Sequence, residues 1–156
     1  MSKPIIKCIK EYMKTCPYLE DLAKIKVDFL DPGDKSKDKE CWSIEKVEAP
    51  IVLKGNVLGT RTQRQCVFVI ASHTFHNPLV DTPNIDNLQL YDNIAEWFLQ
   101  KSRKKELPIL NEGETAIKIE AIDSGYLYGI NEKATLARYQ MRCRLLYEKE
   151  EKSIWH

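Results

Sequence analysis

Several features that would place this chain in a specialised class are scarce or missing. The net charge at pH 7 is only +1, so overall charge gives no argument for binding nucleic acid or an anionic membrane. No apolar run approaches the roughly 20 residues needed to cross a bilayer. The first residues also lack the apolar core and the small-residue cleavage site of a signal peptide. We therefore expect synthesis in a reducing cytoplasm.

Motifs for phosphate and metal chemistry are equally scarce. The six glycines form neither a G-x-G-x-x-G nor a G-x-x-x-x-G-K pattern, which argues against a familiar nucleotide enzyme. His73 and His76 are three residues apart, and Asp81 is the nearest candidate for a third ligand. Because catalytic zinc needs three protein ligands at suitable spacing, we interpret this stretch as a polar loop. We expect no enzyme, no cofactor and no metal.

The five cysteines have no close pairing along the chain: they are Cys8, Cys16, Cys41, Cys66 and Cys143. An odd count in a chain without a signal sequence predicts free thiols. Cys66 and Cys143 fall within strand patterns, so we expect small core residues at both positions. No histidine has a predictable place beside either one, and a Cys–His nucleophile is therefore not indicated.

What is present is the balance of a soluble globular domain, with 43% hydrophobic and 30% charged residues in a chain of 156. A short helix is predicted over 4–15, with Pro4 in its first turn. The strongest pattern predicts a long helix over 83–104, capped by Thr82. Its apolar face is expected to comprise Ile85, Leu88, Tyr91, Ile94, Ala95, Phe98 and Leu99.

The remaining patterns predict strands over 25–30, around Trp42 and Ile44, and over 64–71, 115–122, 126–130 and 134–147. The 64–71 segment is apolar on both faces and is expected to be central. On 115–122, we expect Ile117, Ile119 and Ala121 to share one face. Residues 50–63 carry Pro50, Gly55 and Gly59 and show no clear period.

Short turns between strands favour antiparallel pairing, and packing helices on one side of a sheet is the economical way to bury it. We therefore predict an α+β fold, an antiparallel (mixed) sheet with the long helix and the short N-terminal helix packed on it. One domain is expected over 1–147. Residues 148–156 are expected to form a charged C-terminal tail ending in Ile154 and Trp155.

One side of the last strand is unusually basic. Arg138, Arg142 and Arg144 share it, and like charges on one strand face repel unless water or acidic groups compensate. Two interpretations follow. The arginines either face solvent, or they face an acidic neighbouring subunit or the wall of an assembled ring.

Leu90 and Trp97 are seven residues apart on the long helix, roughly 130° from the centre of its apolar face. They either widen the buried stripe or face a partner, because tryptophan is enriched in interface hot spots. Trp155 in the charged tail is a further candidate for partner contact.

The chain also resembles a known family through the order of its later segments. These are Asn87–Phe98, Leu107–Leu110, Ala116–Ala121, Gly125–Gly129 and Ala137–Leu145. This succession resembles the small minor capsid or tail terminator proteins of Gram-positive phages, and related proteins of contractile, phage-tail-like bacteriocins. The resemblance covers about the last two thirds of the chain; its weight lies in the order of the segments.

The resemblance implies a hexameric ring that caps the tail tube, stops its polymerisation and joins it to the neck, the head connector or the last sheath ring. It implies a sheet flanked by helices, and it supplies no catalytic residue. The partners implied are the tail tube protein and possible sheath and neck proteins, with no membrane and no specific nucleic-acid binding. Such a protein is made in the bacterial host cytoplasm and assembled into the particle.

Two other functions remain open from the sequence. The first is a head–tail joining or tail completion adaptor, which would also assemble as an oligomer and would differ from a terminator only in its place on the particle. A small ligand-binding domain or an enzyme of unknown type would need a preformed apolar pocket with converging polar groups. Steeply salt-dependent DNA binding would reveal a nucleic-acid role for the arginines.

Overall fold

A computed structural model describes residues 3–19, 25–27, 41–55, 60–75, 82–130 and 136–150. These residues form two helices and seven strands. In chain order they are α1 Ile5–Met13, β1 Ile25–Val27, β2 Cys41–Lys46, β3 Val52–Gly55, β4 Arg61–Phe75, α2 Thr82–Arg103, β5 Glu114–Ala121, β6 Tyr126–Ile130 and β7 Leu136–Glu150.

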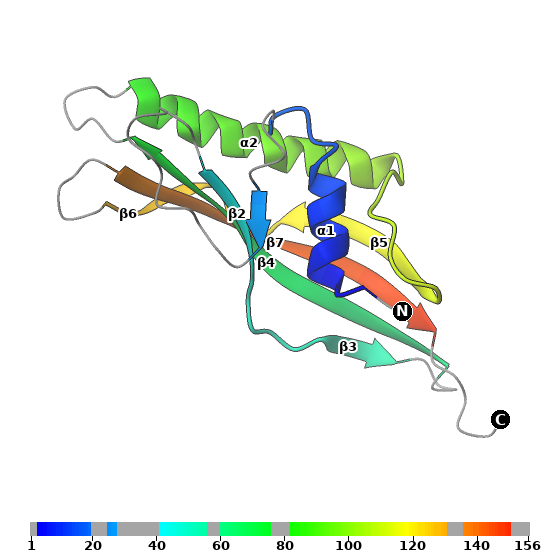
Figure 1. The fold of residues 1–156 in the computed structure, drawn as a ribbon. Helices are drawn as coiled ribbons and strands as arrows, with labels where there is room; N and C mark the ends of the chain where they lie inside the picture. The colour runs from blue at the N-terminus through cyan, green and yellow to red at the C-terminus, as the bar shows by residue number, and fades with distance from the viewer. Residues whose placement is uncertain are drawn as a thin grey trace.

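All the described strands belong to one sheet with the order β1-β2-β4-β7-β5, while β3 pairs with β4 and β6 with β7 (Figure 1). Only the β1–β2 pair is parallel. Short connections join the antiparallel pairs β3–β4 and β6–β7, whereas the antiparallel pairs β2–β4, β4–β7 and β5–β7 bring together strands that are more distant along the chain. The predicted α+β fold with a mixed sheet and two helices is confirmed.

The two longest strands, β4 and β7, pair along their whole lengths at the centre of the sheet. The ladder runs from Arg61 opposite Glu150 to Phe75 opposite Leu136. β4 is therefore the central strand that its apolar faces predict. β7 continues past residue 147 to Glu150, so the first residues of the expected tail belong to the sheet.

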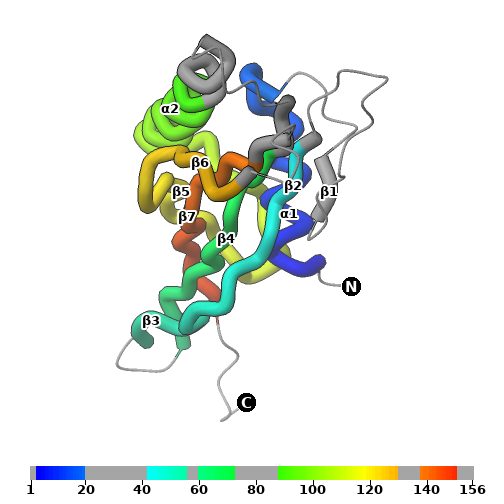
Figure 2. Tube along the Cα trace, turned by 90° about the vertical axis from the view of Figure 1, so that its left-hand side faces the viewer, coloured from blue at the N-terminus to red at the C-terminus, as the bar shows by residue number. Residues whose placement is uncertain are grey.

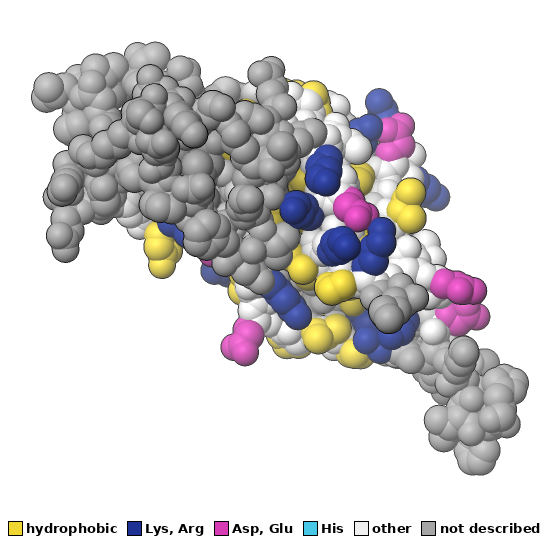
Figure 3. Space-filling model, in the orientation of Figure 1, with side chains coloured by type: hydrophobic (Ala, Val, Ile, Leu, Met, Phe, Trp, Pro, Cys, Tyr) yellow, Lys and Arg dark blue, Asp and Glu magenta, His cyan; other side chains and the backbone are white. Residues whose placement is uncertain are grey.

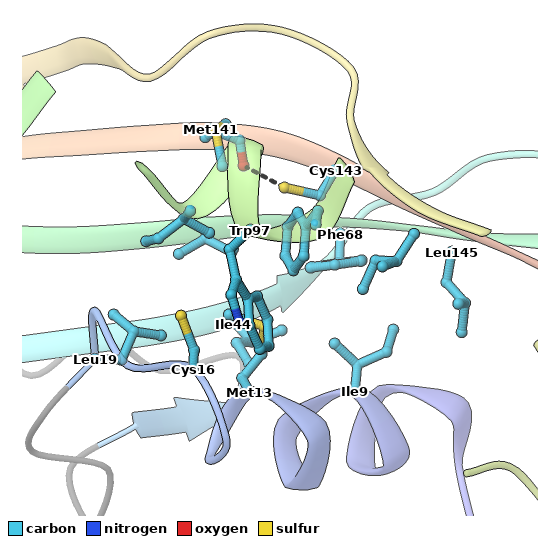
Figure 4. Close-up of a cluster of buried hydrophobic side chains, with 14 of the residues drawn as sticks. Ile9, Met13, Cys16, Leu19, Ile44, Phe68, Trp97, Met141, Cys143 and Leu145 are labelled. Carbon is cyan, nitrogen blue, oxygen red and sulfur yellow. Dashed lines mark hydrogen bonds between the residues drawn. The ribbon is translucent and has the colours of Figure 1, made fainter. Parts of the chain in front are cut away.

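Both helices lie on one face of this sheet, α2 obliquely across its upper part and α1 in front of the middle (Figures 1 and 2). Alternate residues of β4 and β7 turn to that face and are fully buried, among them Phe68 and Met141. Figure 4 shows Ile9 and Met13 of α1 on the opposite side of this cluster. The core therefore forms one layer between the sheet and the helices.

A buried hydroxyl fixes α2 to the two central strands. The Tyr91 oxygen lies 2.6 Å from Ser72 Oγ of β4 and donates a 3.0 Å hydrogen bond to the Tyr139 carbonyl of β7. The turn before β6 presses on the same ring, because a Cβ added at Gly125 would lie 2.4 Å from Tyr91 Cβ. Only glycine fits this approach without a shift of the turn or of the helix.

Two predicted apolar faces are partly wrong. Leu88 and Leu99 of α2 are exposed, because the helix is rotated so that neighbouring positions meet α1 and the sheet. On β5 the register shifts between Ala116 and Lys118, and this bulge leaves Ile117 exposed while Ile119 is fully buried. β3 is a strand within the segment that showed no clear period.

Candidate functional site

The face of the sheet opposite the helices carries the arginines of β7, as alternation along a strand requires. Arg138 donates a 2.8 Å hydrogen bond from Nη2 to Glu45 of β2 and one of 3.1 Å from Nε to Gln140. Its guanidinium also lies 5.3 Å from the centre of the Tyr128 ring, a cation–π distance. Arg138 is thus compensated within its own chain.

Arg144 is compensated in the same way by β5. Its Nη2 donates a 3.0 Å hydrogen bond to Glu120, whose carboxylate also lies 2.7 Å from Lys118 Nζ. Partial burial raises the pKa of the Glu120 carboxyl, but the hydrogen bonds from Lys118 and Arg144 outweigh it and hold that pKa below its usual value. The pair therefore stays ionised at neutral pH.

Arg142 differs from its two neighbours. It is exposed, and its guanidinium makes no hydrogen bond or ion pair with any residue that the structure describes. On β4 its register partner is Val69, which is only 8% exposed. Arg142 is therefore the exposed member of the arginine row, without a charged partner among the described residues.

The structure places Leu90 and Trp97 on the helix side of the sheet. Trp97 is 7% exposed, and its ring centre lies 5.2 Å from that of Tyr12 on α1. Leu90 is half-buried and packs against the same core. Both residues thus widen the buried stripe of α2, and neither is a free surface. Trp155 lies outside the described residues.

Sequence reasoning missed a groove between α1 and the segment that follows α2. It has a volume of about 390 Å³. The Tyr12 hydroxyl fixes one wall by donating a 2.8 Å hydrogen bond to the Glu106 carbonyl. Leu107 lines the floor, and Ile109 is 89% exposed at the edge. The sequence signal available for it was the apolar stretch Leu107–Leu110 in the connection after the long helix.

The groove is lined by Lys101 and by the carboxylates Glu11 and Glu106, while basic residues predominate in the two segments that border it. Residues 3–19 and 101–110 carry eight basic side chains and two carboxylates. We call the eight the basic collar: Lys3, Lys7, Lys10, Lys14, Lys101, Arg103, Lys104 and Lys105. Both carboxylates already have lysine partners, Glu11 in Lys3 and Glu106 in Lys101. Figure 3 shows dark-blue side chains gathered over α1, so this side of the molecule is electropositive despite a near-zero net charge.

The cysteines behave as core residues wherever their side chains are described. Cys8, Cys16, Cys66 and Cys143 are free and buried, which confirms the expectation for Cys66 and Cys143. Burial raises the pKa of the Cys66 thiol to about 11 and also raises the pKa of the Cys143 thiol. Neither thiol is activated as a nucleophile.

No metal-ligand cluster occurs among the residues that the structure describes. Of the candidate ligands considered above, His73 falls in β4, whereas the other two lie outside the described residues. Among the described helices, none is long and apolar enough to span a membrane. The described features considered below are two surfaces, the arginine row of β7 and the groove beside α1.

Together these features define a class, an α+β protein whose single sheet carries its described helices on one face and an arginine row on the other. Comparison of the chain with known proteins does not narrow this class further. No family model matches the sequence, and no curated protein matches it.

Proposed function

We propose that this chain is a structural subunit of a phage or phage-like tail, the tail terminator. Six copies form a ring that caps the tail tube, stops polymerisation and joins it to the neck or the last sheath ring. The subunit is made in the bacterial host cytoplasm and has no catalytic role. The order of segments from the long helix to the last strand supports this proposal, and so does the α+β fold that the resemblance implies.

The observation that carries the proposal is the arginine row on the sheet. Arg138 and Arg144 are held by Glu45 and Glu120 in the chain, so they stiffen the face, while Arg142 remains exposed. An exposed arginine on a rigid, centrally placed strand suits contact with a neighbouring acidic surface. A closed ring needs such a contact between two different faces of successive subunits.

The adaptor alternative uses the same surfaces and differs in location, so imaging separates the two. A ligand-binding domain is favoured by one observation, the groove of about 390 Å³, which falls in the size range of roughly 300–1,000 Å³ used by small-molecule sites. Its lining holds Lys101, Glu11 and Glu106 beside the apolar Tyr12, Leu107 and Ile109.

The test mixes purified protein with tail tubes and images them by electron microscopy. We expect a ring at one end of each tube and no growth beyond it. Arg142→Ala should abolish the ring while leaving the circular dichroism spectrum unchanged, because this side chain holds no described part of the fold. Lys54→Ala, an exposed basic residue on β3, is the matched control and should cap tubes normally.

Three results would count against the proposal or against the contact that it assigns. Protein found along the tube wall or at the head junction would favour the adaptor, and protein absent from tubes would favour a function outside the tail. Normal capping by Arg142→Ala would show that the arginine row is not the subunit contact.

A further inference from the structure

Two strands at opposite edges of the sheet, β3 and β6, lie in unusually apolar surroundings. Among the described strands, β3 has only β4 as a neighbour and β6 has only β7. The two edges carry most of the exposed large hydrophobic side chains that the structure describes, whereas β2, β4 and β7 carry none. They are Ile51, Val52 and Leu53 at one edge, and Ile117, Ile122, Tyr126, Leu127 and Tyr128 at the other. Open sheet edges are normally protected by charged side chains or proline, so both edges suit contact with a further strand.

The backbone of β3 presents hydrogen-bonding groups at its outer edge. The Ile51 carbonyl accepts a 2.8 Å hydrogen bond from the Gln65 amide of β4. Successive residues of a strand direct their backbone groups to alternate sides, so the N–H and C=O of Val52 point away from β4. No described strand lies beyond them, and the Val52 side chain is 50% exposed. This edge therefore has the donor and the acceptor that pairing with an extended segment requires.

At the opposite edge, β5 is closed and β6 is open. Ser102 of α2 bonds both the N–H and the C=O of Ile119, at 3.0 and 2.8 Å. These two bonds occupy the outer side of β5 at its middle. No described residue bonds the outer side of β6 in this way, and Leu127 there is 43% exposed. β6 is therefore the part of this edge that suits a further strand.

The directions of the two edge strands are compatible with each other. β3 is antiparallel to β4, β4 to β7, and β7 to β6. It follows that β3 and β6 run in opposite directions. A second copy in the same orientation, placed beside the first so that its sheet continues the sheet of the first, brings β6 alongside β3 as an antiparallel neighbour.

The side chains fit the same arrangement. Leu127 is the register partner of the buried Tyr139, so it points to the face that carries the helices. On that face a pocket of about 220 Å³ lies beside the start of β3, lined by Ile6 of α1, Ile51 and Tyr147. Antiparallel pairing of two strands this short brings Leu127 of one copy to the vicinity of this pocket in the next.

We infer that β3 of one copy pairs antiparallel with β6 of a second copy, so that one sheet continues from subunit to subunit. The inference deepens the proposed function and rests on it, because it assigns a contact between successive ring subunits in addition to that of Arg142. β3 and β6 are different surfaces, so the contact is heterologous and closes into a ring when the rotation permits.

Charges at one end of the two strands agree with this polarity. Lys54 is exposed at the end of β3, and Asp123 is exposed just before β6. Antiparallel pairing brings these ends together, so opposite charges meet at the rim of the contact. An exposed ion pair contributes little affinity and mainly favours the correct register. Lys54→Ala should therefore weaken association by at most about fivefold.

The contact alone is small. Register shifts interrupt β3 between Val52 and Lys54 and β6 between Leu127 and Gly129, which limits the pairing to a few residues. Stable interfaces bury roughly 1,200–2,000 Å², more than two such short strands supply. Self-association of the purified subunit is therefore weak and dependent on concentration. On a tube end, where neighbouring subunits are held side by side, the effective concentration is high and the same contact forms readily.

The test uses full-length variants and sedimentation velocity over a concentration series. Val52→Pro removes the outward N–H, which β4 does not use, so β3 stays in its own sheet while its outer edge is blocked. Leu127→Asp places a charge in the apolar contact at the other edge. Each should weaken self-association about tenfold or more, with an unchanged far-UV circular dichroism spectrum.

Two variants are the matched controls. Val52→Thr keeps the backbone donor and the branched shape of the side chain. Ile117→Asp places the same charge at a similarly exposed position on β5, the closed part of the edge. Both should associate within about threefold of the wild type, as substitutions at exposed sites outside a contact do.

The decisive sample is the mixture of Val52→Pro with Leu127→Asp. It contains one intact β3 edge and one intact β6 edge on different molecules, so it should give a one-to-one dimer that neither variant forms alone. Pairing of β3 with β3, or of β6 with β6, would leave one of the single variants associating normally. In the wild type, raised protein concentration should slow amide hydrogen exchange at Val52 and in β6.

Four results would overturn the inference. They are a wild type that stays monomeric at every concentration, a single variant that associates normally, a mixture that gives no dimer, and an Ile117→Asp variant that loses association, which would place the contact on β5. None of these requires tail tubes, so they leave the terminator proposal to the imaging test. Conversely, protein that forms the one-to-one dimer but ignores tube ends would sink the proposed function alone.

Discussion

Removing the Tyr91 hydroxyl tests how far one buried polar contact holds the helix layer on the sheet. Tyr91→Phe keeps the ring and deletes the oxygen that meets Ser72 Oγ at 2.6 Å and the Tyr139 carbonyl at 3.0 Å. Tyr91 is fully buried and Ser72 nearly so, so water cannot replace the lost partner. Leaving a buried polar group unsatisfied costs about 1–3 kcal/mol, and we expect that loss in the free energy of unfolding.

The assay is urea unfolding followed by far-UV circular dichroism at one low protein concentration, so that self-association does not contribute. The midpoint should fall while the slope of the transition stays constant. For a chain of this size each kcal/mol lowers Tm by about 2–4 °C. Tyr128→Phe is the control, because that ring is 63% exposed and substitutions at exposed sites stay within about 0.5 kcal/mol. If the two variants unfold alike, the hydroxyl does not hold α2 to the sheet.

Three further outcomes follow from the packing. Gly125→Ala should lower the free energy of unfolding by about 1–3 kcal/mol, because the added Cβ would lie 2.4 Å from Tyr91 Cβ. Gly129→Ala is the control and should leave it unchanged, because no atom lies within 4 Å of the added Cβ. Equal urea midpoints for the two variants would contradict this prediction. The Ser102 hydroxyl accepts a 3.0 Å hydrogen bond from the Ile119 N–H of β5 and donates one of 2.8 Å to the Ile119 carbonyl, so Ser102→Ala should speed amide hydrogen exchange at this strand. Unchanged protection from exchange would show that water replaces the hydroxyl in both hydrogen bonds. The Cys66 thiol, with its pKa raised to about 11, contributes stability that is present below its unfolded pKa of roughly 8.5 and is lost as pH rises toward 11. Cys66→Ala should flatten that alkaline decline in urea titrations, and a decline of the same steepness would refute the assignment.

The regular elements were predictable because their residues repeat with a period that burial imposes. The 83–104 helix and the last strand showed clear periods, and the structure has α2 and β7 there. β3 was not predictable, since all its side chains are exposed and burial imposes no pattern on them. The burial of Trp97 was also hidden, because its ring packs against Tyr12 of α1, which lies far away in the sequence.

The candidate site was likewise predictable only in part. Strand alternation was enough to place Arg138, Arg142 and Arg144 on one face. It was not enough to identify Glu45 and Glu120 as partners, because these lie on other strands, 93 and 24 residues away. Only the sheet order brings them together, and so only the structure distinguishes the exposed arginine from the paired ones.

The pairing of β4 with β7 has a consequence for how the protein is made. β4 ends at Phe75 and its long partner begins at Leu136, so the middle of the sheet stays open while the intervening chain is synthesised. At 5–20 residues per second this takes roughly 3–12 s. During that interval the edge of β4 that will pair with β7 is unpaired on the nascent chain, although β4 is a long strand with apolar residues on both faces. The native sheet is therefore completed only when the last strand emerges, and a message truncated before β7 would yield a chain prone to aggregation rather than a smaller folded protein.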